Sequence, residues 1–132
     1  MMHDQLPRDR IPILRIPTMP KDVNTGGSIF GGWVMSYVDI AGSIPAELRA
    51  RGRVVTRAVQ AFEFKKPVYV GDLVSCYAEV ISEGRTSITV QVDVYAQRIK
   101  HGIVETVLVT DATLVYVAID DNGVPRALPA TS

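Results

Sequence analysis

The chain has little with which to bind a metal or form disulfides, since its 132 residues include one cysteine, Cys76, and two histidines, His3 and His101. A single cysteine excludes an internal disulfide framework and any metal site built from several cysteines. The histidines show neither a paired spacing nor an HExxH pattern, so we expect no catalytic metal. Cys76 falls on the inward face of a predicted strand, where we expect a small core residue rather than a nucleophile. A reducing cytoplasm is the simplest compartment for such a chain.

The chain also lacks an excess of charge and a long apolar run. Lys plus Arg and Asp plus Glu both number 14, so the formal net charge is zero. This balance argues against a protein that binds nucleic-acid phosphates over a broad surface, but it permits a local basic patch for one anionic small molecule. The N-terminal segment MMHDQLPRDR has no apolar signal-peptide core, and charges interrupt the apolar runs before membrane-spanning length. We therefore expect a cytoplasmic protein with no nucleic-acid or membrane partner.

Two familiar catalytic motifs are missing as well. The sequence contains no GxSxG elbow, which counts against an α/β-hydrolase. The run GGSIFGG lacks the GK[ST] ending of a phosphate-binding loop, and it is not followed by a second parallel βα unit. The chemistry must therefore come from other residues of the glycine-rich stretch.

That stretch is residues 20–42 (PKDVNTGGSIFGGWVMSYVDIAG), and we interpret the strands on either side as its support. A polar loop gives way to a helix predicted from about Ile29 to about Arg51, with Gly52 as a stop and Pro45 as a kink or an early end. We expect one apolar arc of this helix to face the core, formed by Phe30, Trp33, Val34, Tyr37, Ala41, Ile44 and Leu48. The opposite face carries Asp39 among Met35, Gly42, Ser43 and Ala46, and should pack against another part of the protein or another subunit.

Strand-like patterns surround the helix. They cover residues 10–16, 54–64, 73–82, 86–98 and 103–119, and the prolines of the first suit an edge strand. One helix cannot cover both faces of a five-stranded sheet, so we predict a single-domain α+β fold in which a curved antiparallel sheet wraps around a long central helix. The predicted domain covers residues 10–124, between a flexible arm at residues 1–9 and an extended tail at residues 125–132.

Candidate catalytic groups cluster in the glycine-rich stretch. The backbone amides of Gly31 and Gly32 open the helix and are suited to an oxyanion, although the glycines would also serve simply to admit the turn. Asp39 is a candidate general base or nucleophile; the alternative is a partly exposed acid or an inter-subunit salt bridge. Asn24 would orient a water or a carbonyl, or act only as a turn residue. Asp111 is a second candidate acid that we interpret as a paired structural charge.

Basic residues are unevenly distributed along the chain. They are Arg49, Arg51, Arg53, Arg57, Lys65, Lys66 and Arg85. The set fits either a solvated rim or a patch for a phosphate-bearing ligand.

Several segments together resemble one known family. These are NTGGSIFGGWVMSYVDIAG, GRVVT, FKKPVYVGDLVSCYAEV, the GRTS turn and YVAIDDNGVPRALP, within residues 16–129. The chain resembles the YciA-like acyl-CoA thioesterases of the hotdog-fold superfamily. The resemblance implies a hotdog fold, hydrolysis of acyl-coenzyme A to a free acid and coenzyme A, and no cofactor beyond the coenzyme A of the substrate. It also implies a homodimer with shared active sites, assembled further as a trimer of dimers.

The resemblance assigns roles to particular residues. Asp39 becomes the catalytic carboxylate, Asn24 comes from the opposite subunit, and the Gly31 and Gly32 amides supply the oxyanion donor. Two segments match the family's coenzyme A contacts, and Arg57 is added to them. The expected coenzyme A-binding residues are Arg57, Lys65, Lys66, Pro67, Gly84, Arg85, Thr86 and Ser87. The chain departs from the family pattern at Ser28, Val38, Ala41 and Pro45, which bears on substrate preference and pocket shape more than on the reaction.

Two other functions compete with thioester hydrolysis. A hotdog dehydratase acting on hydroxyacyl thioesters usually uses a histidine, and neither histidine of this chain is near the glycine-rich stretch in sequence. A non-catalytic acyl-CoA-binding protein would have no need of Asp39.

Overall fold

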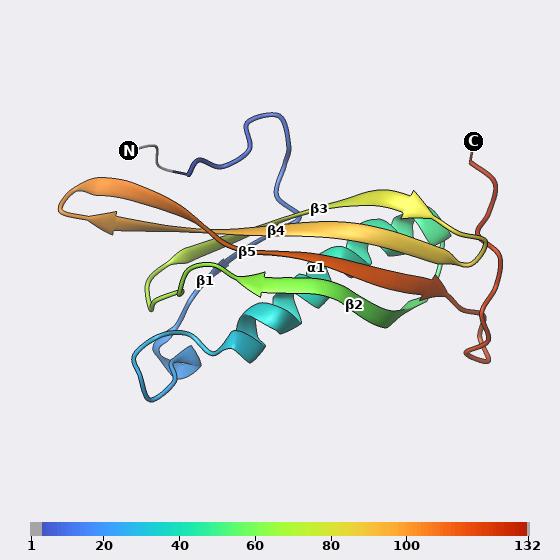
Figure 1. Ribbon diagram of the computed structural model, residues 1–132, viewed down its shortest axis with the longest axis horizontal. Helices are drawn as coiled ribbons and strands as arrows, with labels where there is room; N and C mark the ends of the chain where they lie inside the picture. Colours follow the sequence, from blue (N-terminus) through green and yellow to red (C-terminus); the bar gives the residue numbers. More distant parts are fainter. Residues whose placement is uncertain (1–3, 132) are drawn as a thin grey trace.

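The computed structural model describes residues 4–131, and Figure 1 shows one long helix against a single sheet. The elements are β1 (Leu14–Pro17), the short 3-10 turn η1 (Pro20–Asp22), α1 (Gly31–Ala50), β2 (Val54–Phe64), β3 (Leu73–Glu83), β4 (Ser87–Lys100) and β5 (Ile103–Ala118). All paired strands are antiparallel, in the order β1-β3-β4-β5-β2. The α+β fold predicted from the sequence is confirmed. Residues 1–3 of the predicted arm, including His3, and Ser132 of the predicted tail lie outside the described residues.

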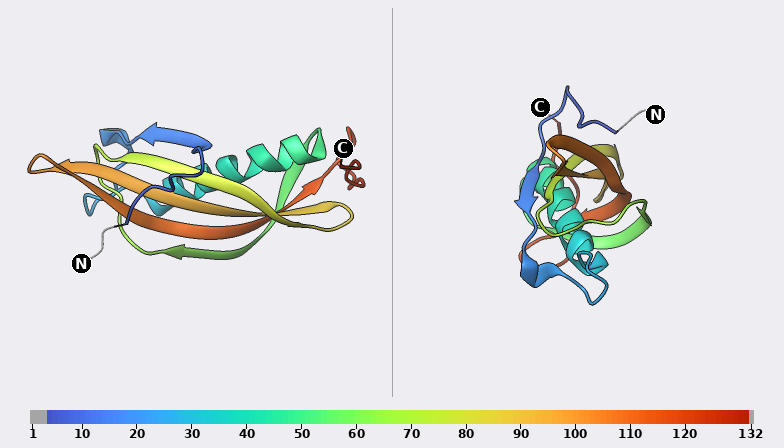
Figure 2. Two further views of the ribbon diagram at one scale, coloured as in Figure 1. Left: turned by 90° about the horizontal axis from the view of Figure 1, so that it is seen from above. Right: turned by 90° about the vertical axis from the view of Figure 1, so that its left-hand side faces the viewer.

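The centre of the sheet is β4, whose alternating pattern made it predictable. Its inward-facing residues Ile88, Val90, Val92, Val94 and Ala96 are completely buried. They form the floor on which α1 lies, along one face of the curved sheet (Figure 2). Burial of such a continuous apolar face is the main force that holds helix and sheet together. No helix in the described part of the chain is both long and apolar enough to cross a membrane.

The helix meets the sheet through small residues, and here the sequence interpretation is partly wrong. The buried helix residues are Val34, Val38, Ala41, Gly42, Ala46 and Ala50. Phe30 and Leu48, which we expected in the core, are 52% and 75% exposed. Gly42 and Ala46, on the face that carries Asp39, are buried, which agrees with our expectation that this face packs against another part of the protein. Small side chains allow the helix axis to approach the large side chains of the sheet, so size rather than hydrophobicity decides which face is covered.

The C-terminal end of α1 is fixed by the tail of the chain. The helix continues through Pro45, and the left-handed residue that ends it is Arg51, with φ of 54°, not Gly52. The guanidinium of Arg126 donates to the carbonyl oxygen of Ala50 at 2.8 Å. A Cβ on Gly52 would lie only 2.7 Å from Nη2 of Arg126, so a larger residue here would displace the guanidinium from this position.

Strand β2 is irregular in a way that matters for the site. Its pairing with β5 shifts register between Thr56 and Ala58 and again between Val59 and Ala61. Each shift adds a residue to β2, as in a β-bulge. The β2 residues opposite the inward-facing Tyr116, Leu114 and Ala112 of β5 are therefore Thr56, Val59 and Phe62, at a spacing of three instead of two.

Candidate active site

The carboxylate of Asp39 lies near the middle of α1 and is held by two hydroxyl groups. Oγ1 of Thr56 donates to Oδ1 of Asp39 at 2.5 Å. The hydroxyl of Tyr116 lies 3.2 Å from the same oxygen and 2.7 Å from the main-chain carbonyl oxygen of Asp39. Within residues 4–131, the hydrogen bonds to this carboxylate all go to Oδ1. Oδ2 is therefore available to a water molecule or a substrate.

The hydroxyls of Thr56 and Tyr116 lie close together because their strands are neighbours in the sheet. Thr56 and Tyr116 are direct partners in the β2–β5 ladder, so their side chains project from the same face of the sheet. The first register shift of β2 follows immediately after Thr56. Bulges of this kind re-aim side chains and are common beside active sites.

Tyr116 is a firm hydrogen-bond donor. It is completely buried. Burial, then the negative charge of Asp39 and the hydrogen bond to it, raise the pKa of the Tyr116 phenol above its ordinary value. The hydroxyl therefore keeps its proton across the physiological pH range and donates it toward Asp39.

An apolar hollow of about 330 Å³ opens beside Asp39. It is lined by Gly32, Met35, Ser36, Asp39, Thr56, Val59, Phe62 and Leu114. The three β2 residues of this lining are the ones that the two register shifts bring to the inward face. The result is a carboxylate with a free oxygen at the edge of an apolar hollow, which is suited to activating water or attacking a carbonyl next to an apolar group.

Backbone amides at the start of α1 are near this hollow. The first helical amide bonds are those of Trp33 and Val34, both to the carbonyl oxygen of Phe30, so the amides of Gly31 and Gly32 precede the helical ladder. A Cβ on Gly32 would meet no atom within 4 Å, whereas one on Gly31 would lie 3.3 Å from the ring of Phe64. The space over Gly32 is thus open to a ligand.

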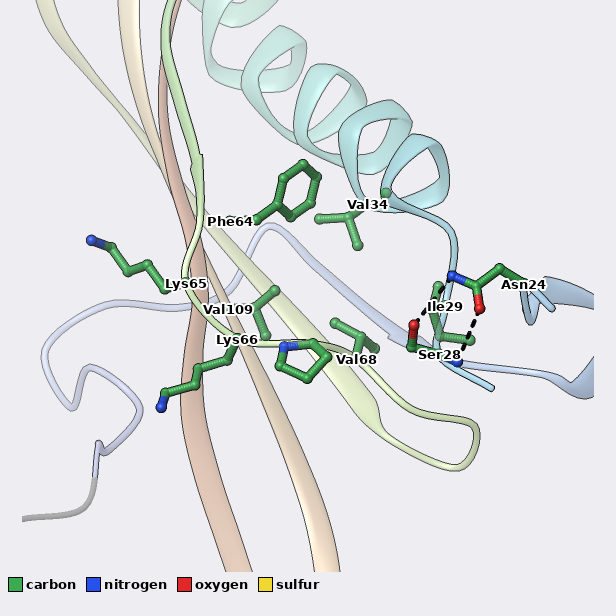
Figure 3. Close-up of a pocket in the computed structure, with 11 residues that line it drawn as sticks. Asn24, Ser28, Ile29, Val34, Phe64, Lys65, Lys66, Val68 and Val109 are labelled. Carbon is green, nitrogen blue, oxygen red and sulfur yellow. Dashed lines mark hydrogen bonds between the residues drawn. The ribbon is translucent and has the colours of Figure 1, made fainter. Parts of the chain in front are cut away.

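Asn24 organises its own loop. Its Oδ1 accepts a hydrogen bond from the amide of Gly26 at 2.8 Å. The same oxygen accepts from the amide of Ser28 at 3.2 Å, and Nδ2 donates to Oγ of Ser28 (Figure 3). These bonds match the turn-forming role that we considered for Asn24. One of the two Nδ2 hydrogens remains for another acceptor.

A second hollow of about 380 Å³ lies at the start of α1, and it holds several predicted site residues. Its lining includes Asn24, Gly31, Lys65, Lys66 and Pro67. Figure 3 shows the side chains of Lys65 and Lys66 pointing away from the helix.

Two of the candidate charged residues form a pair with each other. Nζ of Lys65 lies 3.6 Å from both Glu63 and Asp111, so Asp111 is a paired charge as expected.

The remaining predicted contacts are distant from both hollows. The turn at residues 84–87 follows Glu83, which pairs with Arg49 in the last turn of α1. The second hollow is at the first turn, and the 20 residues of α1 span roughly 30 Å. Arg57 lies exposed on β2. Within one chain, Asp39 and Gly32 therefore line the first hollow, and Asn24 and residues 65–67 line the second. The turn at residues 84–87 of the same chain reaches neither hollow.

Sequence reasoning missed Thr56 and Tyr116. One signal was present, since Gly42 is a glycine inside a helix and such a residue often marks a close approach by another group. The partner in that approach could not be found without the register of β2 and β5.

Other reactive groups do not contribute to this site. Cys76 is completely buried, and burial raises the pKa of its thiol from 9.0 to about 12, so its assignment as a core residue is confirmed. Among residues 4–131, no three His, Cys, Asp or Glu side chains are grouped to hold a metal ion.

Comparison with known proteins gives consistent matches over most of the chain. The family model described as "Thioesterase superfamily" matches residues 26–103. The acyl-CoA thioester hydrolase YciA of Escherichia coli K12 is 45% identical over 118 residues, which cover 89% of each protein.

Solved structures agree with the sequence relatives. The crystal structure of the hexameric thioesterase y2039 from Yersinia pestis is 46% identical, with a TM-score of 0.85, and the match covers 96% of this chain and 100% of that one. HI0827, a hexameric broad-specificity acyl-coenzyme A thioesterase, is 42% identical with a TM-score of 0.87, covering 99% of this chain and 90% of that one. HI0827 was also solved as a variant with one aspartate replaced by alanine. The hotdog fold expected from the resemblance is confirmed.

Proposed function

The chain belongs to the thioesterase superfamily, among its YciA-like acyl-CoA thioester hydrolases, and we propose that it cleaves acyl-CoA to a free acid and coenzyme A through the carboxylate of Asp39. The observation that carries the proposal is the Asp39 carboxylate, with Oδ1 bound by two hydroxyls and Oδ2 free at the edge of an apolar hollow. The hollow would hold the acyl chain, and its opening would place the thioester beside Oδ2.

Two reaction paths are compatible with this arrangement. In the first, Oδ2 of Asp39 takes a proton from water, the water oxygen bonds to the thioester carbon, and the C–S bond breaks as the proton passes to the coenzyme A sulfur. In the second, Oδ2 attacks the carbon directly and expels the thiolate, which leaves a mixed anhydride that water hydrolyses. Label in the Asp39 carboxylate after a single turnover in ¹⁸O-water identifies the anhydride path with water attack at the aspartyl carbon, because the general-base path puts the water oxygen only in the product acid.

The start of α1 supplies the electrostatic part of the proposal. Negative charge develops on the carbonyl oxygen in both paths, and a helix N-terminus presents amide hydrogens and the positive end of the helix dipole. The Gly32 amide is the better placed donor, since Gly32 lines the same hollow as Asp39 and the space above it is open. Gly31 lines the neighbouring hollow and would support the same oxygen from the other side.

The full site requires a second copy of the chain. Within residues 4–131, strand β2 pairs only with β5 and its residues are mostly exposed. A free edge of 11 residues is prone to associate unless it is paired. A two-fold partner paired along this edge has its helix antiparallel to α1. The partner's turn at residues 84–87 then lies at the same end of the dimer as this chain's Asn24 and Lys65. That arrangement supports a shared site, with coenzyme A phosphates held by Lys65, Lys66, Arg57 and the partner subunit's Arg85.

Higher assembly follows from the same relatives. Both compared solved enzymes are hexameric. We expect three such dimers of this chain to form a hexamer, which sedimentation or mass photometry would measure.

Replacement of Asp39 tests the proposal directly. We expect Asp39→Asn and Asp39→Ala to lower kcat for coenzyme A release by at least about 100-fold across short, medium and long acyl-CoAs, because the proton acceptor or nucleophile is lost. Asp111→Asn is the control, since it removes a carboxylate of β5 that pairs with Lys65 and not with Thr56 or Tyr116, and its kcat should stay within about twofold. Full activity in a folded Asp39→Ala protein would overturn the proposal.

A further inference from the structure

A close contact between α1 and β5 lies one turn beyond Asp39. A Cβ placed on Gly42 would overlap with the hydroxyl oxygen of Tyr116 and would lie 3.1 Å from two carbons of its ring. Residues three apart in a helix share a face, so Gly42 and Asp39 present neighbouring surfaces to the same ring. Only the absence of a side chain at position 42 allows the phenol to reach the helix backbone at this point.

The hydroxyl that enters this space contacts Asp39 twice. It lies 2.7 Å from the main-chain carbonyl oxygen and 3.2 Å from Oδ1. A carbonyl oxygen has two lone pairs, so it can accept from Tyr116 in addition to the helical amide. The single hydrogen of the phenol is shared between the two oxygens, with the shorter contact to the carbonyl oxygen. One group therefore restrains the backbone turn that carries Asp39 and, more weakly, the rotamer of its side chain.

Tyr116 is also anchored more firmly than the other donor. It pairs with Thr56 of β2 on one side and with Ile88 of β4 on the other, and its side chain is completely buried. Thr56 makes the shorter contact with Oδ1, but it lies on the edge strand that we propose to pair with the partner subunit, so its position depends on that pairing. The restraint on Asp39 that depends on this chain alone thus comes from β5.

We propose that Tyr116 is a positioning residue for thioester hydrolysis, whose hydroxyl, admitted by Gly42, fixes Asp39 so that Oδ2 points toward the reacting carbonyl. The proposal rests on the assigned role of Asp39. Tyr116 touches no reacting atom in this scheme and acts through the carboxylate. It should therefore affect the chemical step and not the binding of coenzyme A.

The first experiment removes the hydroxyl and keeps the ring. Tyr116→Phe should lower kcat by about 10-fold with KM within about twofold, because a hydrogen bond to a charged group is lost while the binding surfaces remain. Tyr95→Phe is the matched control, since Tyr95 packs against Tyr77 and not against Asp39, and its kcat should be unchanged. A Tyr116→Phe enzyme with the kcat of the unmodified protein would overturn the inference.

A second experiment separates positioning from general packing. Gly42→Ala should lower kcat about as much as Tyr116→Phe, because the new methyl group displaces the hydroxyl. The double variant, Gly42→Ala with Tyr116→Phe, should be at most about twofold slower than Tyr116→Phe alone, since the hydroxyl is already absent and only two ring carbons at 3.1 Å remain close to the new methyl group. Multiplicative losses in the double variant would show two independent packing defects and would contradict the inference.

The two proposals fail in different ways. Retained activity in Asp39→Ala removes the role of Asp39 and with it the basis for Tyr116. Loss of activity in Asp39→Ala, combined with unchanged kcat in Tyr116→Phe, leaves the proposed function intact and refutes only the positioning role.

Discussion

Asp72 and Arg98 form an ion pair whose carboxylate is almost completely removed from solvent. The Asp72 side chain is 2% exposed, and its oxygens accept from Nε and Nη2 of Arg98 at 3.0 and 2.8 Å. The same carboxylate accepts from the amide of Tyr69 at 2.9 Å, so it closes the turn that leads into β3.

Removal of Arg98 should therefore be costly. Arg98→Met leaves the Asp72 carboxylate buried without its cation, and we expect the free energy of unfolding to fall by about 3–5 kcal/mol. Arg10→Met is the control, because Arg10 pairs with Glu79 and Asp93 in a more exposed position, and its loss should cost less than about 1 kcal/mol. Urea denaturation of both variants measures the difference, and equal losses would contradict this assignment.

Thr56 offers a matched pair of substitutions at the candidate active site. Thr56→Val keeps the branched shape and removes the 2.5 Å hydrogen bond to Asp39, so we expect kcat to fall by about 10-fold. Thr56→Ser keeps the hydroxyl and should remain within about threefold. Steady-state release of coenzyme A provides the measurement. If the serine variant were as slow as the valine variant, shape rather than hydrogen bonding would be the role of Thr56.

A shared active site predicts complementation between two inactive chains. Asn24→Ala and Asp39→Ala homodimers should each be strongly impaired. A mixed dimer retains one site that combines an intact Asp39 with the partner subunit's intact Asn24, so about half of the activity per dimer should return. Co-expression with two different affinity tags isolates hexamers that contain both chains, in which the activity of the mixed dimers is measured above that of the two unmixed ones. Absence of any recovery would count against the shared site.

Cys76 should make stability depend on alkaline pH. Burial raises the thiol pKa to about 12 in the folded protein from 9.0. Above pH 9 the unfolded chain releases this proton while the folded chain keeps it, so the contribution of the thiol is complete below pH 9 and is lost as pH rises toward 12. The expected slope is up to about 1.4 kcal/mol per pH unit. Cys76→Ala should reduce that slope between pH 9 and 11, and an unchanged slope would exclude the thiol as its source.

The fold could be predicted because its elements carry regular patterns. The alternation from Ile88 to Ala96 specifies an inward face without ambiguity, since a shift of one residue would reverse every side chain. The position of Asp39 was also visible, because a carboxylate among small residues is unusual within a helix.

The remaining features depend on contacts between distant segments. Thr56, Val59 and Phe62 share the inward face of β2 because of two register shifts. A search of the sequence for residues that alternate between two faces cannot detect such shifts. The helix face was misassigned because the closest approach to Tyr116 requires Gly42, whereas hydrophobicity alone favoured Phe30 and Leu48. Side-chain size at a contact is known only when both partners are known.

The contact between Gly42 and Tyr116 also restricts the order in which these two positions can change during evolution. An alanine that appears first at position 42 meets the phenol oxygen and disturbs Asp39 at once. A phenylalanine that appears first at position 116 removes the nearest of the three atoms that the alanine would meet, and leaves two ring carbons at 3.1 Å. Lineages that carry alanine at position 42 should therefore have passed through an ancestor with phenylalanine, or another residue without the hydroxyl, at position 116.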